Sequence, residues 1–100
     1  MKLVWTEPAI LDLQVIRDYI ARDSEHYAIN FIEGVFAVVE KIIAFPKLGR
    51  KVPEIQSETI REILYSNYRI IYEIKDTEII IVSIVHGARD FKNIYPWDVT

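Results

Sequence analysis

Three apolar segments in the C-terminal half of the chain are separated by only two or three residues, and this spacing constrains the fold more than any other feature. Residues 60–65 (IREILY), 68–74 (YRIIYEI) and 78–85 (EIIIVSIV) are rich in the β-branched and aromatic residues that favour strands. The turns between them are Ser66-Asn67 and Lys75-Asp76-Thr77. Parallel neighbours need a crossover of a dozen or more residues, so these connections predict antiparallel strands.

Two helices are expected before these strands. Thr6-Glu7-Pro8 is typical of a helix start, because threonine caps the first turn, glutamate suits its positive end and proline is tolerated there. Asp23 or Ser24 is placed to cap a second helix that ends at about Phe45, where Pro46 follows. The apolar residues of the first helix have the spacing of one helical face: Ala9, Leu13, Ile16 and Ile20.

The second helix carries more apolar surface than one buried face requires. Its expected core stripe is Ala28, Ile32, Val35, Val39 and Ile42. The large apolar residues away from that stripe are Ile29, Phe31, Phe36, Val38 and Ile43. Two interpretations remain open: the first helix covers this excess, or the excess is a docking surface for a partner or a second copy.

The resulting element order is β-α-α-β-β-β, with a short apolar strand at residues 2–5 and a loop at residues 47–59. This order predicts an α+β fold in which two N-terminal helices pack on a small, mainly antiparallel sheet. A chain of 100 residues with a hydrophobic share of 51% is long enough for one core, so we interpret residues 1–100 as a single domain.

Composition argues against several classes of protein. With no cysteine and two histidines, we expect neither a disulfide nor a metal site, and no glycine pattern for nucleotide phosphates is present, so no cofactor is expected. The net charge of −3 gives no overall basic field for nucleic acid. The longest apolar runs are far too short for a membrane span, which predicts a cytoplasmic protein without membrane contact.

One group of side chains has the chemistry for phosphate binding and proton transfer: Arg61, Arg69, His86, Arg89 and Tyr95. The guanidinium group offers paired donors to phosphate, and a histidine or tyrosine nearby moves a proton when RNA is cleaved. A structural interpretation stands beside this one. Arg61 and Arg69 are then solvated strand residues or ion-pair partners of Glu62 and Glu73. His86 in that interpretation bonds to a loop carbonyl as the strand ends.

The length of the hairpin turn decides whether two of these arginines can act together. If Ser66-Asn67 forms a two-residue turn, Tyr65 pairs with Tyr68, and Arg61 and Arg69 lie on opposite faces of the sheet. A three-residue loop pairs Tyr65 with Arg69 instead and places both arginines on one face. Both geometries remain open from the sequence.

Three motifs together resemble the RelE/ParE toxin superfamily: FPKLGRKVPE (residues 45–54), IREILYSNYRIIYEI (60–74) and IVHGARD (84–90). The opening VWTEPAILDLQVIRDYIARDS (4–24) is similar to the first helix of that family, and the resemblance extends to about Tyr95. It implies a small α+β toxin encoded beside a cognate antitoxin that wraps around it, and hence a toxin–antitoxin hetero-oligomer.

The superfamily divides by target. RelE-like members cut messenger RNA on the ribosome, whereas ParE-like members are held to poison DNA gyrase without being nucleases. Under the RelE-like alternative, the resemblance gives catalysis to Arg61, Arg69, Arg89 and Tyr95, with His86 as a further candidate. Ile63 occupies the second basic position of the first hairpin strand, however, and cannot stabilise a phosphate.

The GR-x-V-P-E loop and the H-G-A-R-D ending are similar to ParE-like and plasmid-stabilisation members, so the resemblance favours a ParE-like inhibitor of DNA gyrase. The alternatives are a ribosome-dependent endoribonuclease and a non-toxic binding module. Glycine after His86 is expected to adopt a backbone angle that other residues avoid, turning the last strand out of the sheet. The residues expected to contact the target or antitoxin are Arg50, Phe36, Ile43, His86 and Arg89.

Overall fold

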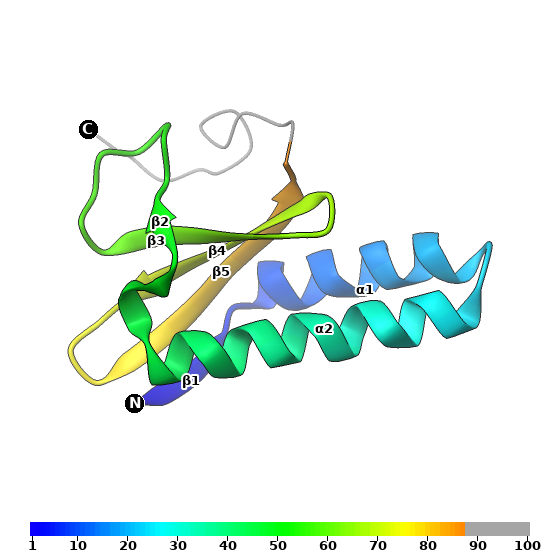
Figure 1. The fold of residues 1–100 in the computed structure, drawn as a ribbon, viewed down its shortest axis with the longest axis horizontal. Coiled ribbons are helices and arrows are strands. Elements are labelled where there is room, and N and C mark those ends of the chain that lie inside the picture. Colours follow the sequence, from blue (N-terminus) through cyan, green and yellow to red (C-terminus); the bar gives the residue numbers. More distant parts are fainter. Residues whose placement is uncertain (88–100) are drawn as a thin grey trace.

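The computed structural model describes residues 1–87 and places the three expected strands at the centre of a five-stranded sheet (Figure 1). β3 (Ile60–Tyr65), β4 (Tyr68–Ile74) and β5 (Glu78–His86) are antiparallel neighbours. β1 (Lys2–Trp5) pairs with β5 in parallel, and β2 (Arg50–Lys51) pairs with β3 in antiparallel orientation. The predicted α+β fold is confirmed, with β2 as an extra two-residue strand inside the expected loop.

Both helices begin at the residues that the sequence indicates. α1 (Glu7–Ala21) is capped by Thr6, whose hydroxyl accepts the N–H of Ala9 at 3.2 Å. α2 (Glu25–Ala44) is capped by Ser24, which accepts the N–H of Tyr27 at 3.1 Å and so decides between the two expected caps. The chain continues into a short 3₁₀ helix, η1 (Pro46–Leu48), because proline cannot extend the α-helical hydrogen bonds. Within residues 1–87, neither helix is long and apolar enough to cross a membrane.

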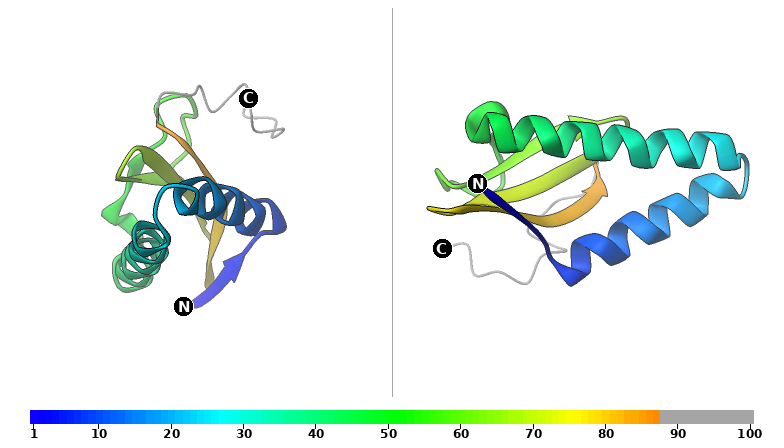
Figure 2. Two further views of the ribbon diagram at one scale, coloured as in Figure 1. Left: turned by 90° about the vertical axis from the view of Figure 1, so that its right-hand side faces the viewer. Right: turned by 90° about the horizontal axis from the view of Figure 1, so that it is seen from below.

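The two helices lie antiparallel on one face of the sheet (Figures 1 and 2). Their buried residues meet the sheet in one apolar cluster that includes Ile16 of α1, Val35 and Ile42 of α2, and Ile70 of β4. A second cluster lies on the opposite face, where Val52 and other loop residues cover the sheet. The loop that follows β2 therefore forms a third layer, in addition to the helices and the sheet that the sequence predicted.

Part of the apolar excess of α2 is buried, and for Phe31 the rings that cover it belong to the β3–β4 hairpin and not to the first helix. Phe31 is buried against the rings of Tyr65 and Tyr68, and Ile43 is partly buried against the main cluster. Ile29 and Phe36 remain exposed, although the Phe36 ring also makes an edge contact with Trp5 at 5.9 Å.

The first hairpin has the two-residue turn. Tyr65 pairs with Tyr68, and Ser66 adopts a positive φ of 54°. Arg61 lies opposite Tyr72 on the helix-covered face, whereas Arg69 lies on the other face with Glu62. The two arginines therefore do not share a face, and the alternative with one arginine-lined surface is wrong.

A bulge interrupts the pairing of β4 with β5, and α1 compensates for it. Ile71 lies opposite Ser83 while the next residue, Tyr72, lies opposite Ile81. The carboxylate of Asp12 on α1 accepts hydrogen bonds from the Ser83 hydroxyl at 2.8 Å and from the Ile84 N–H at 3.0 Å. A helix side chain thus satisfies backbone and hydroxyl donors at the irregular part of the strand.

Candidate functional site

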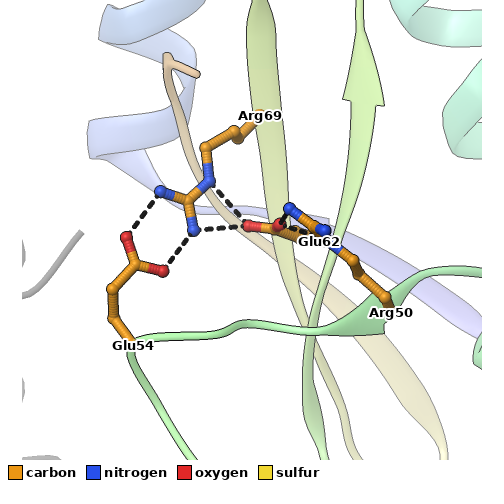
Figure 3. A network of polar contacts seen from close by, with 4 residues as sticks. All are labelled: Arg50, Glu54, Glu62 and Arg69. Atoms are coloured by element: carbon orange, nitrogen blue, oxygen red, sulfur yellow. Dashed lines mark hydrogen bonds and ion pairs between the residues drawn. The ribbon is translucent and has the colours of Figure 1, made fainter. Parts of the chain in front are cut away.

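Arg69 lies at the centre of a chain of ion pairs on the face of the sheet opposite the helices (Figure 3). Its two terminal nitrogens donate to the two oxygens of Glu54 at 2.7 and 2.6 Å, which is the paired geometry that a guanidinium forms with a carboxylate. Its Nε donates to Glu62 at 2.6 Å. The Arg69 side chain is 5% exposed. Its guanidinium already donates to two carboxylates of the same chain, so a phosphate would have to displace them.

The chain of charges continues from Glu62 to Arg50. The Glu62 side chain is fully buried, and its other oxygen accepts from the Nε and a terminal nitrogen of Arg50, each at 2.7 Å. Two arginines and two glutamates make the group formally neutral. Hydrogen bonds from Arg69 to Glu54 raise the pKa of the guanidinium above its usual value, against the opposing effect of burial. Arg69 therefore stays charged at every ordinary pH.

Arg61 belongs to a different cluster, under the start of β2. One terminal nitrogen donates to the carbonyl of Gly49 at 3.0 Å, and its buried Nε has no hydrogen-bond partner among the described residues. The Tyr72 hydroxyl donates to the carbonyl of Pro46 at 2.6 Å and accepts the N–H of Gly49 at 2.9 Å. Burial raises the pKa of Tyr72, which keeps this phenol neutral and able to donate.

These contacts give the GR-x-V-P-E motif a structural role. Gly49 has to be glycine, because a Cβ there would lie 2.6 Å from both the Glu62 carbonyl and the Tyr72 hydroxyl. Arg50 and Glu54 are held by partners on β3 and β4. Arg50 was expected to contact the target or the antitoxin. Its guanidinium is bound by Glu62, and 59% of the side chain remains exposed. The motif fastens the loop to the sheet.

The expected ion pair between an arginine of the hairpin and Glu62 is present, at Arg69. The sequence did not single out Glu54, which binds the two terminal nitrogens of Arg69. The signal for Glu54 in the sequence is its position four residues after Arg50 in a motif that carries both charges. Asp12 was missed as well. Asp12 stands out in the sequence only as an acidic residue next to the apolar stripe of the first helix. No residue pattern predicts the β4–β5 bulge where Asp12 accepts its hydrogen bonds.

His86 is the last residue of β5 and is exposed, with its ring edge-on to that of Tyr68 at a centroid distance of 5.8 Å. The expectation for Gly87 is wrong, since no glycine among the described residues has a positive φ. Space is the better reason for this glycine: a Cβ would lie 3.3 Å from the Asn67 carbonyl, which accepts the Gly87 N–H at 2.8 Å. Arg89 and Tyr95 lie outside the described residues.

A surface cavity of about 390 Å³ lies between α2 and β3. We call it the β3 groove and define it by Val38, Lys41, Leu48, Arg50, Ile63 and Leu64, which line it with part of the adjoining backbone. Ile63, which replaces a basic residue expected of RelE-like toxins, contributes apolar surface here and packs against the main cluster. Within residues 1–87, no group of three or more histidine or acidic side chains is placed to hold a metal ion.

The fold and these motifs can be compared with known proteins. A family model described as the ParE toxin of the type II toxin-antitoxin system parDE matches residues 3–91. The chain belongs to the ParE toxin family. The expected RelE/ParE superfamily is thereby confirmed. The match includes the GR-x-V-P-E loop, both hairpins and the H-G-A-R-D segment.

Among proteins similar to this ParE family member is the toxin RelE2 of Caulobacter vibrioides, which is 33% identical over 89 residues, covering 88% of this chain and 97% of the relative. In structure, the chain is similar to one from the chromosomal ParDE system of P. aeruginosa, with a TM-score of 0.70 and 22% identity, covering 86% of this chain and 95% of the other. The toxin–antitoxin complex RelBE2 of Mycobacterium tuberculosis gives a TM-score of 0.53 at 18% identity, covering 85% and 95%. At these identities the two structures support the fold alone.

Proposed function

We propose that this ParE family member arrests growth by poisoning DNA gyrase, that it does not cut RNA, and that a cognate antitoxin neutralises it by binding it. The observation that carries the proposal is the pairing of Arg69. A nuclease site needs that guanidinium to meet a phosphate, whereas here Glu54 and Glu62 occupy its donors inside the protein.

The positions of the other candidate residues support the same conclusion. Arg61 faces the helices and donates to Gly49, on the opposite side of the sheet from Arg69. Ile63 offers neither a proton nor a charge. Cleavage of RNA needs an acid, a base and phosphate-binding groups around one phosphodiester. Arg61 and Arg69 lie on two separate faces of the sheet, so they do not bind one phosphate together.

The runner-up is ribosome-dependent cleavage of messenger RNA, and the name RelE2 of the Caulobacter relative is the observation that favours it. This alternative requires Arg89 and Tyr95, with His86 at the end of β5, to supply most of the catalytic chemistry. A non-toxic binding module on the same fold is the third possibility. The three differ in what the purified protein does to DNA and RNA.

The test is a pair of assays on the full chain without any partner: a gyrase supercoiling and DNA-cleavage assay, and cleavage of messenger RNA on programmed ribosomes. The proposal predicts trapped, cleaved DNA and intact message. Cut message with unaffected gyrase would establish the runner-up, and inactivity in both assays together with normal growth on expression would favour a binding module.

Two variants sharpen this test. Tyr95→Phe removes only a hydroxyl and is expected to leave gyrase poisoning unchanged, whereas a RelE-like nuclease would lose most of its activity. His86→Ala is likewise expected to keep toxicity, because His86 is exposed and lies beyond the core. Loss of toxicity in a folded His86→Ala protein would instead indicate proton transfer by this ring. Circular dichroism provides the check on folding.

A further inference from the structure

Two cations lie directly opposite each other where β2 pairs with β3. Lys51 on β2 is the cross-strand partner of Arg61 on β3, so both side chains lie on the same face of the sheet. Like charges in this arrangement destabilise a sheet, and negative charge beside them relieves the repulsion. The surroundings of this pair therefore show whether the protein supplies that negative charge itself.

The fold supplies one carboxylate to the pair. Glu58 accepts a hydrogen bond from Lys51 at 2.7 Å, and the Glu58 side chain is 77% exposed. This hydrogen bond and the charges of Lys51, Arg61 and Lys47 lower the pKa of Glu58, so Lys47 of η1 lies close enough to act on the same carboxylate. We call Lys47, Lys51 and Arg61 the basic edge. With one acid for three cations, the basic edge keeps an excess of positive charge.

Arg61 holds its charge at this place without an ion pair. One terminal nitrogen donates to the Gly49 carbonyl, and no carboxylate among residues 1–87 binds the guanidinium. The side chain is half-buried, and its buried Nε has no hydrogen-bond partner in the described part of the chain. The cation under β2 is therefore fixed in place while its charge is uncompensated.

Arg50 lies next to the basic edge but does not add to its excess charge. Its guanidinium binds the buried carboxylate of Glu62, which also binds Arg69, and Arg69 binds Glu54. These two arginines and two glutamates neutralise each other inside the protein. The positive charge of the basic edge faces solvent instead, because Lys47 is exposed and the Lys51 side chain is 53% exposed.

The basic edge lies at one end of the longest axis of the molecule (Figure 1). β2 and η1 lie at that end, whereas the connection between α1 and α2 lies at the other. Three exposed acids lie near this connection beside two arginines: Asp18, Asp23, Glu25, Arg17 and Arg22. An uneven distribution of this kind orients a protein in the field of an anionic partner, even though the net charge is −3.

We propose that the basic edge binds the phosphate backbone of double-stranded DNA. Lys47 and Lys51 each contact a phosphate as exposed point charges, and Arg61 adds a fixed charge beside them. The contact does not depend on base sequence, because phosphates carry no sequence information. Resting on the proposed function, the inference identifies this DNA as the segment that gyrase holds.

Contact with DNA gives a physical reason for poisoning. A poison raises the amount of cleaved DNA only if it binds the gyrase complex with cleaved DNA more tightly than the complex with intact DNA. A cationic surface that contacts phosphates of the cleaved segment supplies part of this difference in affinity. The basic edge then acts as a DNA contact inside a complex of three components.

The first test measures binding of the full-length protein, without gyrase, to a fluorescein-labelled DNA duplex, with anisotropy as the readout over a range of salt concentrations. Each neutralised phosphate contributes about −0.9 to the slope of log K against log salt, so three cations predict a slope of about −2.7. The double variant Lys47→Gln/Lys51→Gln keeps one cation and is expected to give a slope of about −0.9, with affinity at least about tenfold lower in about 50 mM salt. No binding by the wild type, or equal binding by the double variant, would overturn the inference.

Two single changes at exposed positions are the matched controls. Glu58→Gln removes the acid that competes with phosphate for Lys51, and it is expected to strengthen binding by about two- to fivefold, the contribution of an exposed ion pair. Arg22→Gln removes a cation at the opposite end of the molecule and is expected to leave binding unchanged. Unchanged or weaker binding by Glu58→Gln, or a loss in Arg22→Gln equal to that in the double variant, would refute a site at the basic edge.

Two comparisons identify the ligand and separate the possible failures. RNA of the same length that binds at least about tenfold more tightly than duplex DNA would overturn DNA as the partner and assign the basic edge to RNA. In the gyrase DNA-cleavage assay, the double variant is expected to trap at least about fivefold less cleaved DNA than the wild type. DNA binding through the basic edge without any trapped DNA would refute the proposed function and leave the DNA site standing. Equal trapping by wild type and double variant would leave the proposed function standing and overturn this inference.

Discussion

The Arg69→Met substitution tests whether the buried ion pairs stabilise the fold. Methionine has a similar length and no charge, so the change removes the guanidinium and leaves two carboxylates behind. Glu54 is 20% exposed and can be rehydrated in the variant. Glu62 is fully buried and keeps only Arg50 as a partner.

The size of the effect follows from these two environments. A hydrogen bond to a charged group contributes about 1.5–3 kcal/mol, and breaking a buried pair by removing one partner costs about 3–5 kcal/mol. Because the buried Glu62 carboxylate cannot regain water, the cost of leaving it without Arg69 is larger than the cost at Glu54. We therefore expect the free energy of unfolding to fall by about 3–5 kcal/mol. Small domains have only about 5–15 kcal/mol in total, so the variant will be close to unfolding.

Urea denaturation at pH 7 and 25 °C provides the measurement, with the m-value checked for two-state behaviour. The matched control is Glu62→Met combined with Arg69→Met, which removes the stranded carboxylate and is expected to recover at least about 2 kcal/mol of the loss. A cost below about 1 kcal/mol for Arg69→Met, or no recovery in the double variant, would refute the argument. Such a result would return Arg69 to the list of groups available for a ligand.

Three further changes test other parts of the structure by urea denaturation. Tyr72→Phe is expected to cost about 1–3 kcal/mol, because the buried Gly49 N–H and the partly buried Pro46 carbonyl lose their partner. Burial raises the pKa of Tyr72, so the stability that its neutral hydroxyl contributes is complete below the unfolded-state pKa of about 10. That stability is lost as the pH rises through the pKa of Tyr72 in the folded protein. A difference in unfolding free energy between wild type and Tyr72→Phe that did not narrow above pH 10 would contradict this. Ser66→Gly is expected to stabilise the protein by about 0.5–1 kcal/mol by relieving the positive φ, and a destabilised variant would show that the turn is unstrained. Asp12→Ala is expected to cost about 1–3 kcal/mol and to speed amide exchange at Ile84, with Asp12→Asn as the milder control; equal exchange in wild type and Asp12→Ala would exclude this bond.

Much of the fold was predictable because local rules determine it. The short turns required antiparallel neighbours, Thr6 and Ser24 had the chemistry of helix caps, and the stripe through Val35 and Val39 matched one buried face. Each of these signals involves residues close together in the chain. Local residue spacing and secondary-structure propensity are therefore sufficient to predict these strands, caps and helix faces.

The candidate site was less predictable because its outcome depended on register and on pairs distant in sequence. A one-residue difference in the turn at Ser66 decides which face Arg69 occupies, and no local pattern selects between the two lengths. Glu54 reaches Arg69 only because the loop after β2 folds across the sheet. Arg69 has the paired donors that the sequence predicted, but Glu54 and Glu62 bind those donors inside the protein.

The parallel pairing of β1 with β5 has a consequence for synthesis of the protein. Lys2 pairs with Glu78, and the Thr6 hydroxyl donates to the carbonyl of Ile81 at 3.0 Å. The first strand therefore has no strand partner among residues 1–87 until the fifth has been translated. Closing so long a loop costs entropy and raises the mean sequence separation of contacts, which slows folding relative to a chain with local contacts alone. A nascent or prematurely terminated chain that lacks β5 cannot complete the sheet. An incomplete product of translation is then expected to be a substrate for proteases and not a functional protein.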